Sequence, residues 1–453
     1  ALVRINEDHP AIGIQISQET EFDHRLQSPS YIVQTHADGT FSISGITKGR
    51  YNLVLMKQGW GVRYYYNLPI IAGNNNLSEL LAVKYKDLYT AAKSRNTAIL
   101  YPERILSNYI NSDFTFLENR SYIANNDVNF TSSVVINNGT YIWLGEGRKL
   151  SFYSSISVTG NGTGFTRLTN AYSMYETTVR TVSELQEKRF YELDCYTGIT
   201  FADNRLASVI TSFADVGWNI ISSSILMENL IFRYNRIGLQ CQQNSNITLQ
   251  KSILSYSTDS QNGCFTHTST SNNNIDKIIA YKCNIAIRQH SSQNAAISNS
   301  YFENNSSIDV YNLYETTGSV NHCVFNNSKV AIDTSGLSNT NVQYCNIIAQ
   351  VGIYNHDQLN WFPSFFTANF NNFYCSSYSV RTKSAYYSPE SHHYNGKNNF
   401  WNTTSSGTIA SYIWDMTDET EPPAPSAYWH GVVDYTPFKL YPIDTAGITG
   451  ITK

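Results

Sequence analysis

A short pattern recurs through the second half of this 453-residue chain about once every 23 residues. Each unit places an apolar residue after a small or polar one, and these apolar positions form a first column: Leu239, Cys264, Ile287, Ile308, Ile332, Ile353 and Val380. A second column lies about 8 to 12 residues earlier in each unit: Asn229, Ser252, Ile278, Ser300, Cys323, Cys345 and Asn369. A fixed period of this length indicates one supersecondary unit stacked on itself.

The repeating unit alternates short apolar bursts with turn residues. The bursts are β-branched or aromatic, as at Ile297, Phe302, Val320 and Phe325, and Asn, Ser, Thr and Gly separate them. This pattern predicts strand, turn, strand, turn, because nothing in the unit has helical periodicity. Stacking such units in register gives a coil of parallel strands about 4.8 Å apart. Inward positions then form ladders of like residues, in which Asn, Ser or Cys can share a column with Ile.

Segments outside the strict repeat extend the same pattern. They are Val134–Ile142, Leu150–Phe152, Tyr196–Phe201, Asn398–Asn402 and Val433–Phe438. Together with the repeat, they resemble the right-handed parallel β-helix family, the pectate-lyase-like solenoids of bacterial surface and secreted proteins, over roughly residues 115–410. The resemblance implies an architecture. It implies no activity, because this fold carries enzymes and non-enzymes alike.

The N-terminal region, residues 1–85, lacks the repeat. Ala11–Ile16 and Tyr51–Leu55 alternate like strands, and Asp38-Gly39 is a hairpin turn signal. The run His36–Tyr51 resembles the carboxypeptidase regulatory-like domain, which implies a small β-sandwich and says nothing about peptidase activity. The predicted fold class is therefore all-β, with an N-terminal sandwich at 1–85 followed by a right-handed parallel β-helix at 115–410.

Three further segments complete the predicted organisation. Residues 86–114 form a connector, with a helical turn at Leu88–Ala98. A helical excursion is expected near 179–190, where Thr181 and Glu184 have the spacing of a capping box. Residues 411–453 are rich in proline and form an extended tail. Because solenoid ends expose unpaired strand edges, the tail is expected either to cap one end or to reach a neighbouring molecule.

Composition limits the classes of partner. Net charge is −4 and 15% of residues are charged, so the chain lacks the electrostatic footprint of a nucleic-acid-binding protein. No apolar run reaches the roughly 18 to 20 residues that a membrane span needs. The chain starts directly in a strand-like segment, which we interpret as a processed, mature form. We therefore expect a secreted or cell-surface protein with no nucleic-acid partner and no membrane span.

Cysteine and histidine spacing favours structural roles. The seven cysteines show no metal-binding spacing, and those in the columns are expected to pack as small hydrophobes. Four histidines of the repeat region are interpreted as solvent-facing turn residues: His267, His290, His322 and His356. We predict no metal site and no cofactor.

The outward position just after the first column holds the candidate site residues. These are Gln240, Phe265, Arg288, Asp309, Asp333, Tyr354 and Arg381. The repeat predicts Asp309 and Asp333 on consecutive coils, with Arg288 one coil before them. Two carboxylates about 5 Å apart would raise each other's proton affinity, as acid/base chemistry on a glycosidic bond requires. Asp309, Asp333 and Arg288 are therefore the catalytic candidates.

A structural interpretation of these residues is favoured over a catalytic one. Every solenoid has outward columns, and the combination typical of polysaccharide hydrolases, Asn-x-Asp with a following Asp-Asp pair and Gly-His-Gly, is absent. Phe265, Tyr311 and Tyr354 are expected either to stack on sugars or to contact another subunit. We expect a non-enzymatic structural or adhesive protein that self-associates into a filament, sheath or surface layer. The alternatives are a polysaccharide lyase or glycoside hydrolase, and a glycan-binding adhesin.

Overall fold

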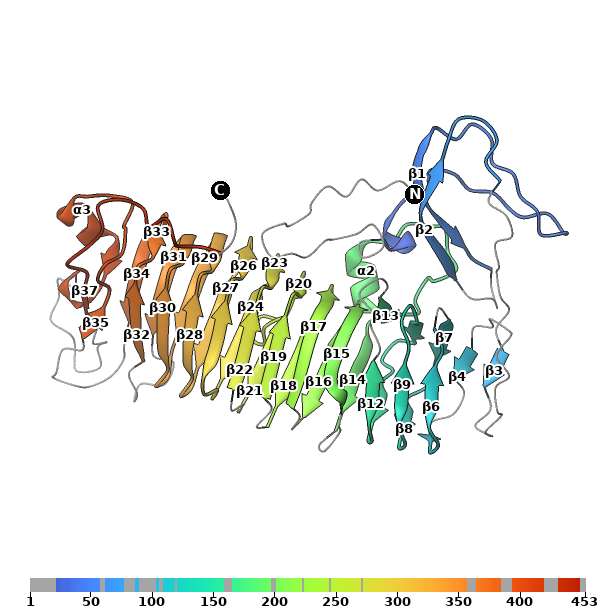
Figure 1. The fold of residues 1–453 in the computed structure, drawn as a ribbon, viewed down its shortest axis with the longest axis horizontal. Coiled ribbons are helices and arrows are strands. Elements are labelled where there is room, and N and C mark those ends of the chain that lie inside the picture. The colour runs from blue at the N-terminus through green and yellow to red at the C-terminus, as the bar shows by residue number, and fades with distance from the viewer. Residues whose placement is uncertain are drawn as a thin grey trace.

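The computed structural model contains a parallel β-solenoid of about 11 turns, with its strands stacked along the longest dimension of the molecule (Figure 1). It describes residues 22–57, 62–76, 86–88, 103–105, 109–118, 120–158, 165–196, 201–221, 224–243, 246–269, 272–356, 364–383, 393–418 and 431–448. The all-β solenoid is therefore confirmed, whereas its right-handed, pectate-lyase-like class remains a prediction.

Each coil contributes to three parallel sheets, because its chain bends between short strands. Sheet 1 contains β4 (Glu103–Ile105), which also pairs with β3 (Lys86–Leu88), then β7 (Ser121–Ala124), β10 (Tyr141–Leu144), β13 (Thr166–Asn170), β15 (Phe201–Ser212), β17 (Ser224–Arg233), β20 (Ile253–Ser255), β23 (Ile279–Tyr281), β26 (Tyr301–Glu303), β29 (Val324–Thr334), β31 (Asn346–His356) and β33 (Asn372–Phe373). The long strands β15, β17, β29 and β31 also reach a second sheet.

Sheets 2 and 3 form the other two sides. Sheet 2 contains β5 (Tyr109–Ile110), β8 (Val128–Phe130), β11 (Leu150–Phe152), β14 (Phe190–Cys195), β16 (Ala214–Ile221), β18 (Ile237–Gln242), β21 (Phe265–Thr268), β24 (Ile285–His290), β27 (Ile308–Leu313), the C-terminal parts of β29 and β31, β34 (Tyr378–Lys383) and β36 (Ile413–Trp414). Sheet 3 contains β6 (Phe114–Phe116), β9 (Val134–Ile136), β12 (Ile156–Val158), the N-terminal parts of β15 and β17, β19 (Asn246–Gln250), β22 (Asn272–Asp276), β25 (Ala295–Ser298), β28 (Thr317–Asn321), β30 (Asn339–Gln343), β32 (Phe365–Asn369), β35 (His393–Asn395) and β37 (Val432–Asp434).

One continuous apolar core fills the solenoid. Register places like residues over one another: Phe302 pairs with Phe325 and their rings stack at 4.9 Å. Val310, Ile332 and Ile353 follow one another on successive strands, and all are fully buried. Burying a side chain of this size stabilises a fold by about 1.5 to 3 kcal/mol relative to leaving it exposed. Six of the seven cysteines are buried and all seven are free thiols, as the sequence predicts.

The first column is shifted in two of its coils. Leu239 pairs with Phe265, not with Cys264, and Ile332 pairs with Val310, not with Ile308. Ile308 pairs with Val330 and packs against an outer cluster containing Tyr311 and Leu313. Apolar residues stand on both sides of Asp309, so the spacing alone does not fix which of them faces the core. The predicted repeat length is correct, whereas in these two coils the predicted column residue is not the one that faces the core.

Polar side chains inside the corners bond to the backbone. Asn371 accepts from the amide of Cys345 at 2.9 Å and donates to the carbonyl of Val342 at 2.9 Å. Ser300 accepts from the amide of Ile278, and Ser252 from that of Leu230, by way of their hydroxyl oxygens. The preceding residue at several of these corners has a left-handed backbone. Such bonds satisfy buried donors and acceptors, which explains why the second column tolerates Asn and Ser.

Helix α2 (Val182–Glu187) interrupts the solenoid between β13 and β14. Thr181 caps its first turn, and Glu184 reaches back to the Thr181 amide, so the predicted capping box is present. Asn170 of β13 donates to the carbonyls of Leu185 and Lys188, which fixes the helix against sheet 1. The excursion near 179–190 is therefore confirmed as a six-residue helix.

The N-terminal region shows one antiparallel pair in its described part, β1 (Gly49–Leu55) with β2 (Arg63–Ile70). Asp38-Gly39 lies in a turn closed by a hydrogen bond between the Gly39 amide and the His36 carbonyl. The predicted strand at 11–16 and the helical turn at 88–98 lie outside or at the edge of the described residues. The sandwich therefore remains a prediction.

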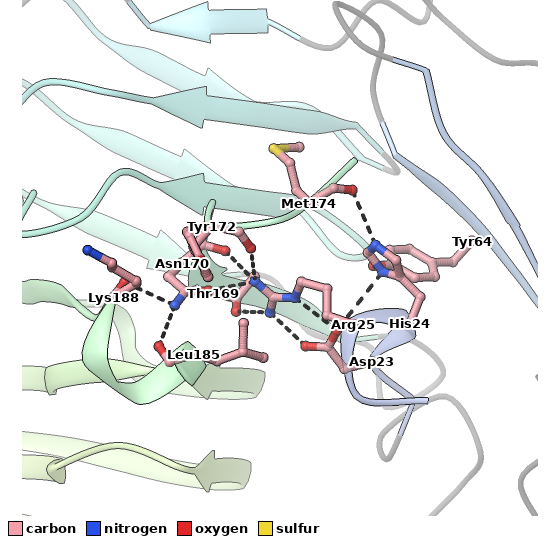
Figure 2. A network of polar contacts seen from close by, with 10 residues as sticks. All are labelled: Asp23, His24, Arg25, Tyr64, Thr169, Asn170, Tyr172, Met174, Leu185 and Lys188. Atoms are coloured by element: carbon pink, nitrogen blue, oxygen red, sulfur yellow. Dashed lines mark hydrogen bonds and ion pairs between the residues drawn. The ribbon is translucent and has the colours of Figure 1, made fainter. Parts of the chain in front are cut away.

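This N-terminal module lies beside the solenoid rather than over its end (Figure 1). A short 3-10 helix, η2 (His24–Leu26), carries it onto sheet 1. There the guanidinium of Arg25 meets Thr169 and Asn170 of β13, and His24 joins Tyr64 of β2 (Figure 2). The contact joins residues about 145 positions apart, which a repeat pattern does not encode.

The C-terminal region builds the last coil and then runs back along sheet 1. Helix α3 (Ser406–Ser411), β36, the 3-10 helix η3 (Met416–Asp418) and β37 belong to that coil. The side-chain amide of Asn372 donates to the carbonyl of Ile443 and accepts from the Ile443 backbone amide. The backbone amide of Gly447 donates to the carbonyl of Tyr344 at 2.7 Å. The described tail therefore packs against its own solenoid.

We predict that Asn371→Ala lowers the free energy of unfolding by about 2 to 5 kcal/mol, because it leaves the Cys345 amide and the Val342 carbonyl buried and unsatisfied. Urea unfolding followed by circular dichroism measures the change. Asn272→Ala is the matched control: its side chain is exposed and its bond to Asn246 lies on the surface, so a change within about 0.5 kcal/mol is expected. Equal stability of Asn371→Ala and the wild type would contradict the role of the corner bonds.

Candidate functional site

One outward column runs along sheet 2 from β8 to β36. Strand pairing connects its members one after another: Asn129, Ser151, Asp194, Asn219, Gln240, Thr266, Arg288, Tyr311, Asp333, Tyr354, Arg381 and Trp414. We call this set the outer column. Parallel pairing separates consecutive members by about 4.8 Å. The column therefore presents polar and aromatic groups at the repeat distance of the rod.

The outer column is recessed although it points away from the core. Its members are buried or half-buried, and Thr266, Asp333 and Tyr311 expose only 1%, 3% and 7% of their surface. Neighbouring side chains and turns provide the cover: Arg288 reaches Asn262 of the turn before β21, and Tyr311 packs with Leu313 and Ile285. The burial of these members lowers the dielectric around the charges beside them.

Arginine and aromatic groups alternate at the C-terminal part of the outer column. The guanidinium of Arg381 lies 5.4 Å from the ring centre of Tyr354 and 5.1 Å from that of Trp414. Tyr354 also stacks on His356, with ring centres 4.6 Å apart. Flat rings held side by side in this way offer a stacking surface, and the arginine between them adds a fixed positive charge.

Asp333 forms the charged centre of this part. Its Oδ1 lies 2.9 Å from Nδ1 of His356. Burial raises the pKa of Asp333, and the contact with His356 opposes that rise. The same carboxylate contributes to raising the pKa of Tyr311, after burial as the main cause.

The predicted pairing of Asp309 with Asp333 on consecutive coils is wrong. Tyr311 is the neighbour of Asp333, whereas Asp309 occupies the inner corner next to Val310. Its Oδ1 accepts from Nδ2 of Asn305 at 2.7 Å and from the hydroxyl of Ser328 at 2.9 Å. Burial raises the pKa of Asp309 to about 7. Asp309 stands at a position that small residues such as Ala331 fill in other coils, so it is a buried structural carboxyl.

The remaining candidates divide between the core and the outer column. Phe265, predicted to face outward, is fully buried in the core beside Ile287. Arg288, Tyr311 and Tyr354 do belong to the outer column. Because the coil of Asp309 is shifted by two residues, Tyr311 rather than Asp309 is in register with Arg288 and Asp333.

His267 also departs from the sequence interpretation, because it is fully buried and not in a turn. Its Nδ1 lies 2.9 Å from Nδ2 of Asn273 and 2.8 Å from the hydroxyl of Ser292. Burial lowers the pKa of His267 to about 3. An uncharged imidazole therefore forms part of a polar ladder inside the solenoid, in line with Gln289 and Asn312.

A carboxylate pair that the repeat did not reveal lies near the other end of the outer column. Asp194 belongs to the column and Glu192 stands two residues before it on β14. Burial and then the charge of Asp194 raise the pKa of Glu192 to about 7. Burial also raises the pKa of Asp194, against the bonds from Tyr196 and Asn219. Residues 190–195 precede the strict repeat, so only the short spacing of the two acids signals this pair.

Sheet 3 carries a second outward surface of different chemistry. A shallow groove of about 450 Å³ runs over β17, β19, β22 and β25. Amides of successive coils bond along it: Asn272 donates to Asn246 at 3.2 Å, and Asn294 donates to Asn272 at 3.0 Å. We call it the asparagine groove, and its lining residues carry no charge. Its open face suits an uncharged ligand, whereas the outer column is charged and aromatic.

No group of three or more metal-ligating side chains occurs among the described residues. In the same part of the chain, no helix has the length and apolar character that a membrane crossing requires. No family model, curated protein or solved structure matches this chain.

We predict that Asp309→Asn stabilises the protein at pH 8 by a few degrees in Tm. The folded pKa of about 7 exceeds the unfolded value of 3.8, so the wild type loses stability as pH rises from 3.8 through 7. Asn keeps an oxygen acceptor for Asn305 and Ser328 and removes the buried charge. Differential scanning calorimetry should show that the gain shrinks as pH falls toward 4. Asp309→Ala is the control that also removes the bonds, and a pH-independent effect of Asp309→Asn would contradict the assignment.

Proposed function

We propose that this protein is a non-enzymatic, extracellular adhesive rod that binds a polysaccharide along the outer column of sheet 2. The observation that carries the proposal is the run Tyr354, Arg381 and Trp414, in which two aromatic rings hold a guanidinium between them. Polysaccharides are long and repeat, and so does this column. Aromatic faces and cationic forks are the groups that recognise sugar rings and their acidic substituents.

The burial of the outer column supports a binding role over a purely solvated surface. A column that merely faced water would expose its Tyr and Arg side chains, whereas these are half-buried and positioned by neighbours. Rigid side chains lose little conformational entropy when a ligand binds. The rod provides this rigidity, because every strand in the column is paired on both sides except at the ends.

We predict that Tyr354→Ala weakens retention on the cognate polysaccharide about fivefold, since one stacking contact contributes about 1 kcal/mol. The measurement is affinity electrophoresis or co-sedimentation against a panel of acidic and neutral polysaccharides. Asn272→Ala, in the asparagine groove, is the matched control and should bind like the wild type. Loss of binding in Asn272→Ala with full binding in Tyr354→Ala would move the ligand to sheet 3 and contradict the proposal.

Glycoside hydrolysis is the second candidate function, and the pair Glu192 and Asp194 favours it. A glycosidase needs one carboxylic acid that stays protonated near neutral pH and a second carboxylate close to it. Burial and the neighbouring charge place Glu192 in that range. If the protein cleaves its polysaccharide, Glu192→Gln should abolish release of reducing ends, and binding through Tyr354 should persist. Binding without any release by the wild type favours the adhesive function.

A further inference from the structure

The asparagine groove on sheet 3 contains a bonded line of side-chain amides that crosses consecutive coils. Asn246 donates through Nδ2 to the hydroxyl of Ser224 at 3.3 Å. Asn272 donates to Oδ1 of Asn246 at 3.2 Å, and Asn294 donates to Oδ1 of Asn272 at 3.0 Å. All three asparagines are exposed, and all three line the groove. The line therefore holds each amide in one orientation relative to the next coil.

This line uses half of the hydrogen-bonding capacity of Asn246 and Asn272. An asparagine side chain has two N–H groups and two carbonyl lone pairs. In both residues, one N–H donates along the line and one lone pair accepts from the following coil. One donor and one acceptor in each of these coils therefore remain for a ligand in the groove. Neighbouring hydroxyl groups of a sugar ring offer the complementary acceptor and donor, because a hydroxyl can do both.

A second column beside the amides supplies small and apolar side chains. Strand pairing places one member in each coil, two residues after the amide position: Leu226, Thr248, Asn274 and Ala296. Leu226, Thr248 and Ala296 are half-buried, so they form a low floor beside the exposed amides. The C–H face of a sugar ring can pack on this floor while its hydroxyl groups face the amides, which removes apolar surface from water.

The repeat distance of the groove suits an extended sugar chain. The groove covers β17, β19, β22 and β25, and consecutive coils lie about 4.8 Å apart. One ring of an extended, equatorially linked glycan advances its chain by nearly the same distance as one coil. Successive rings can therefore meet successive amides, and the groove accommodates about four rings.

The groove favours a ligand without charge. None of its lining residues is acidic or basic. A carboxylate or sulfate placed there would lose its hydration without gaining a charged partner, which is unfavourable. Arg205 lies beside Leu226 in the preceding coil, but it is ion-paired with Glu228. The outer column of sheet 2 differs in this respect, because it includes Arg288 and Arg381.

We propose that the asparagine groove binds a neutral, extended glycan, with one sugar ring in each coil. This site goes beyond the polysaccharide site of the outer column and does not depend on it, since the two lie on different sheets. Amides held in place by their neighbours lose little conformational entropy when a ligand binds, which suits a site built from weak single contacts. With both sites occupied, one rod joins a neutral glycan to an acidic one.

Two substitutions in the full chain test the groove, with β-1,4-linked glucose oligosaccharides as the ligand and isothermal titration calorimetry as the measurement. Asn272→Ala removes one free donor and one free acceptor, so affinity should fall about fivefold. Ala296→Tyr fills the floor and should abolish binding. Asn326→Ala is the matched control and should bind like the wild type, because it removes a half-buried amide from sheet 1 that donates to the Tyr301 hydroxyl at 3.0 Å. Circular dichroism checks that each variant folds.

Wild-type affinity should rise as the oligosaccharide lengthens from two rings to four. A wild type that binds none of these neutral ligands overturns the proposal, and so does unchanged binding by both Asn272→Ala and Ala296→Tyr. Tyr354→Ala should keep its affinity for the neutral ligands, and Asn272→Ala should keep wild-type retention on acidic polysaccharide. A loss of neutral binding in Tyr354→Ala alone would place that ligand on sheet 2 and also overturn the proposal. Failure of the groove and failure of the outer column therefore give different results.

Discussion

Parallel backbone pairing between consecutive coils decides where every side chain of this protein lies. Because each strand bonds to the strand one coil before and one coil after, residue identity propagates along columns: Val310, Ile332 and Ile353 stack in the core, and Tyr311, Asp333 and Tyr354 stack outside it. A substitution in one coil is therefore felt by its neighbours above and below. The core, the polar ladders and the outer surfaces are all consequences of this one constraint.

Because of this pairing, moving a carboxylate by one or two positions along a strand changes the free energy of holding its charge. Asp309 and Asp333 belong to similar coil positions in the sequence, yet one carboxyl lies in an inner corner and the other faces outward beside His356. Inside, burial favours the protonated form, and two hydrogen bonds only partly offset it. Outside, a histidine provides a compensating partner. Two residues of one type thus have separate roles.

The three sides of the rod are used differently. Sheet 1 is occupied by the N-terminal module and the returning tail, through Asn170 at one position and Asn346 and Asn372 at others. Sheet 2 carries the recessed outer column, and sheet 3 the asparagine groove. The contacts within the chain on sheet 1 therefore lie away from the outer column and from the asparagine groove. A solenoid allows this separation because its sides do not compete for the same residues.

The sequence determined the period, the strand-and-turn character of each unit, the capped helix at Thr181 and the burial of the cysteines, because these depend on local pattern alone. It also placed Arg288, Asp333, Tyr354 and Arg381 in one outward column. Only the tertiary structure decided that Val310 rather than Ile308 enters the core, that Phe265 is buried, and that Arg25 meets Asn170. The strand register can be assigned only when the neighbouring coil is known, since apolar residues on both sides of Asp309 satisfy the sequence pattern equally well. The contact between Arg25 and Asn170 depends on two surfaces that are distant in the sequence, and the repeat pattern of the solenoid does not predict which surfaces will meet.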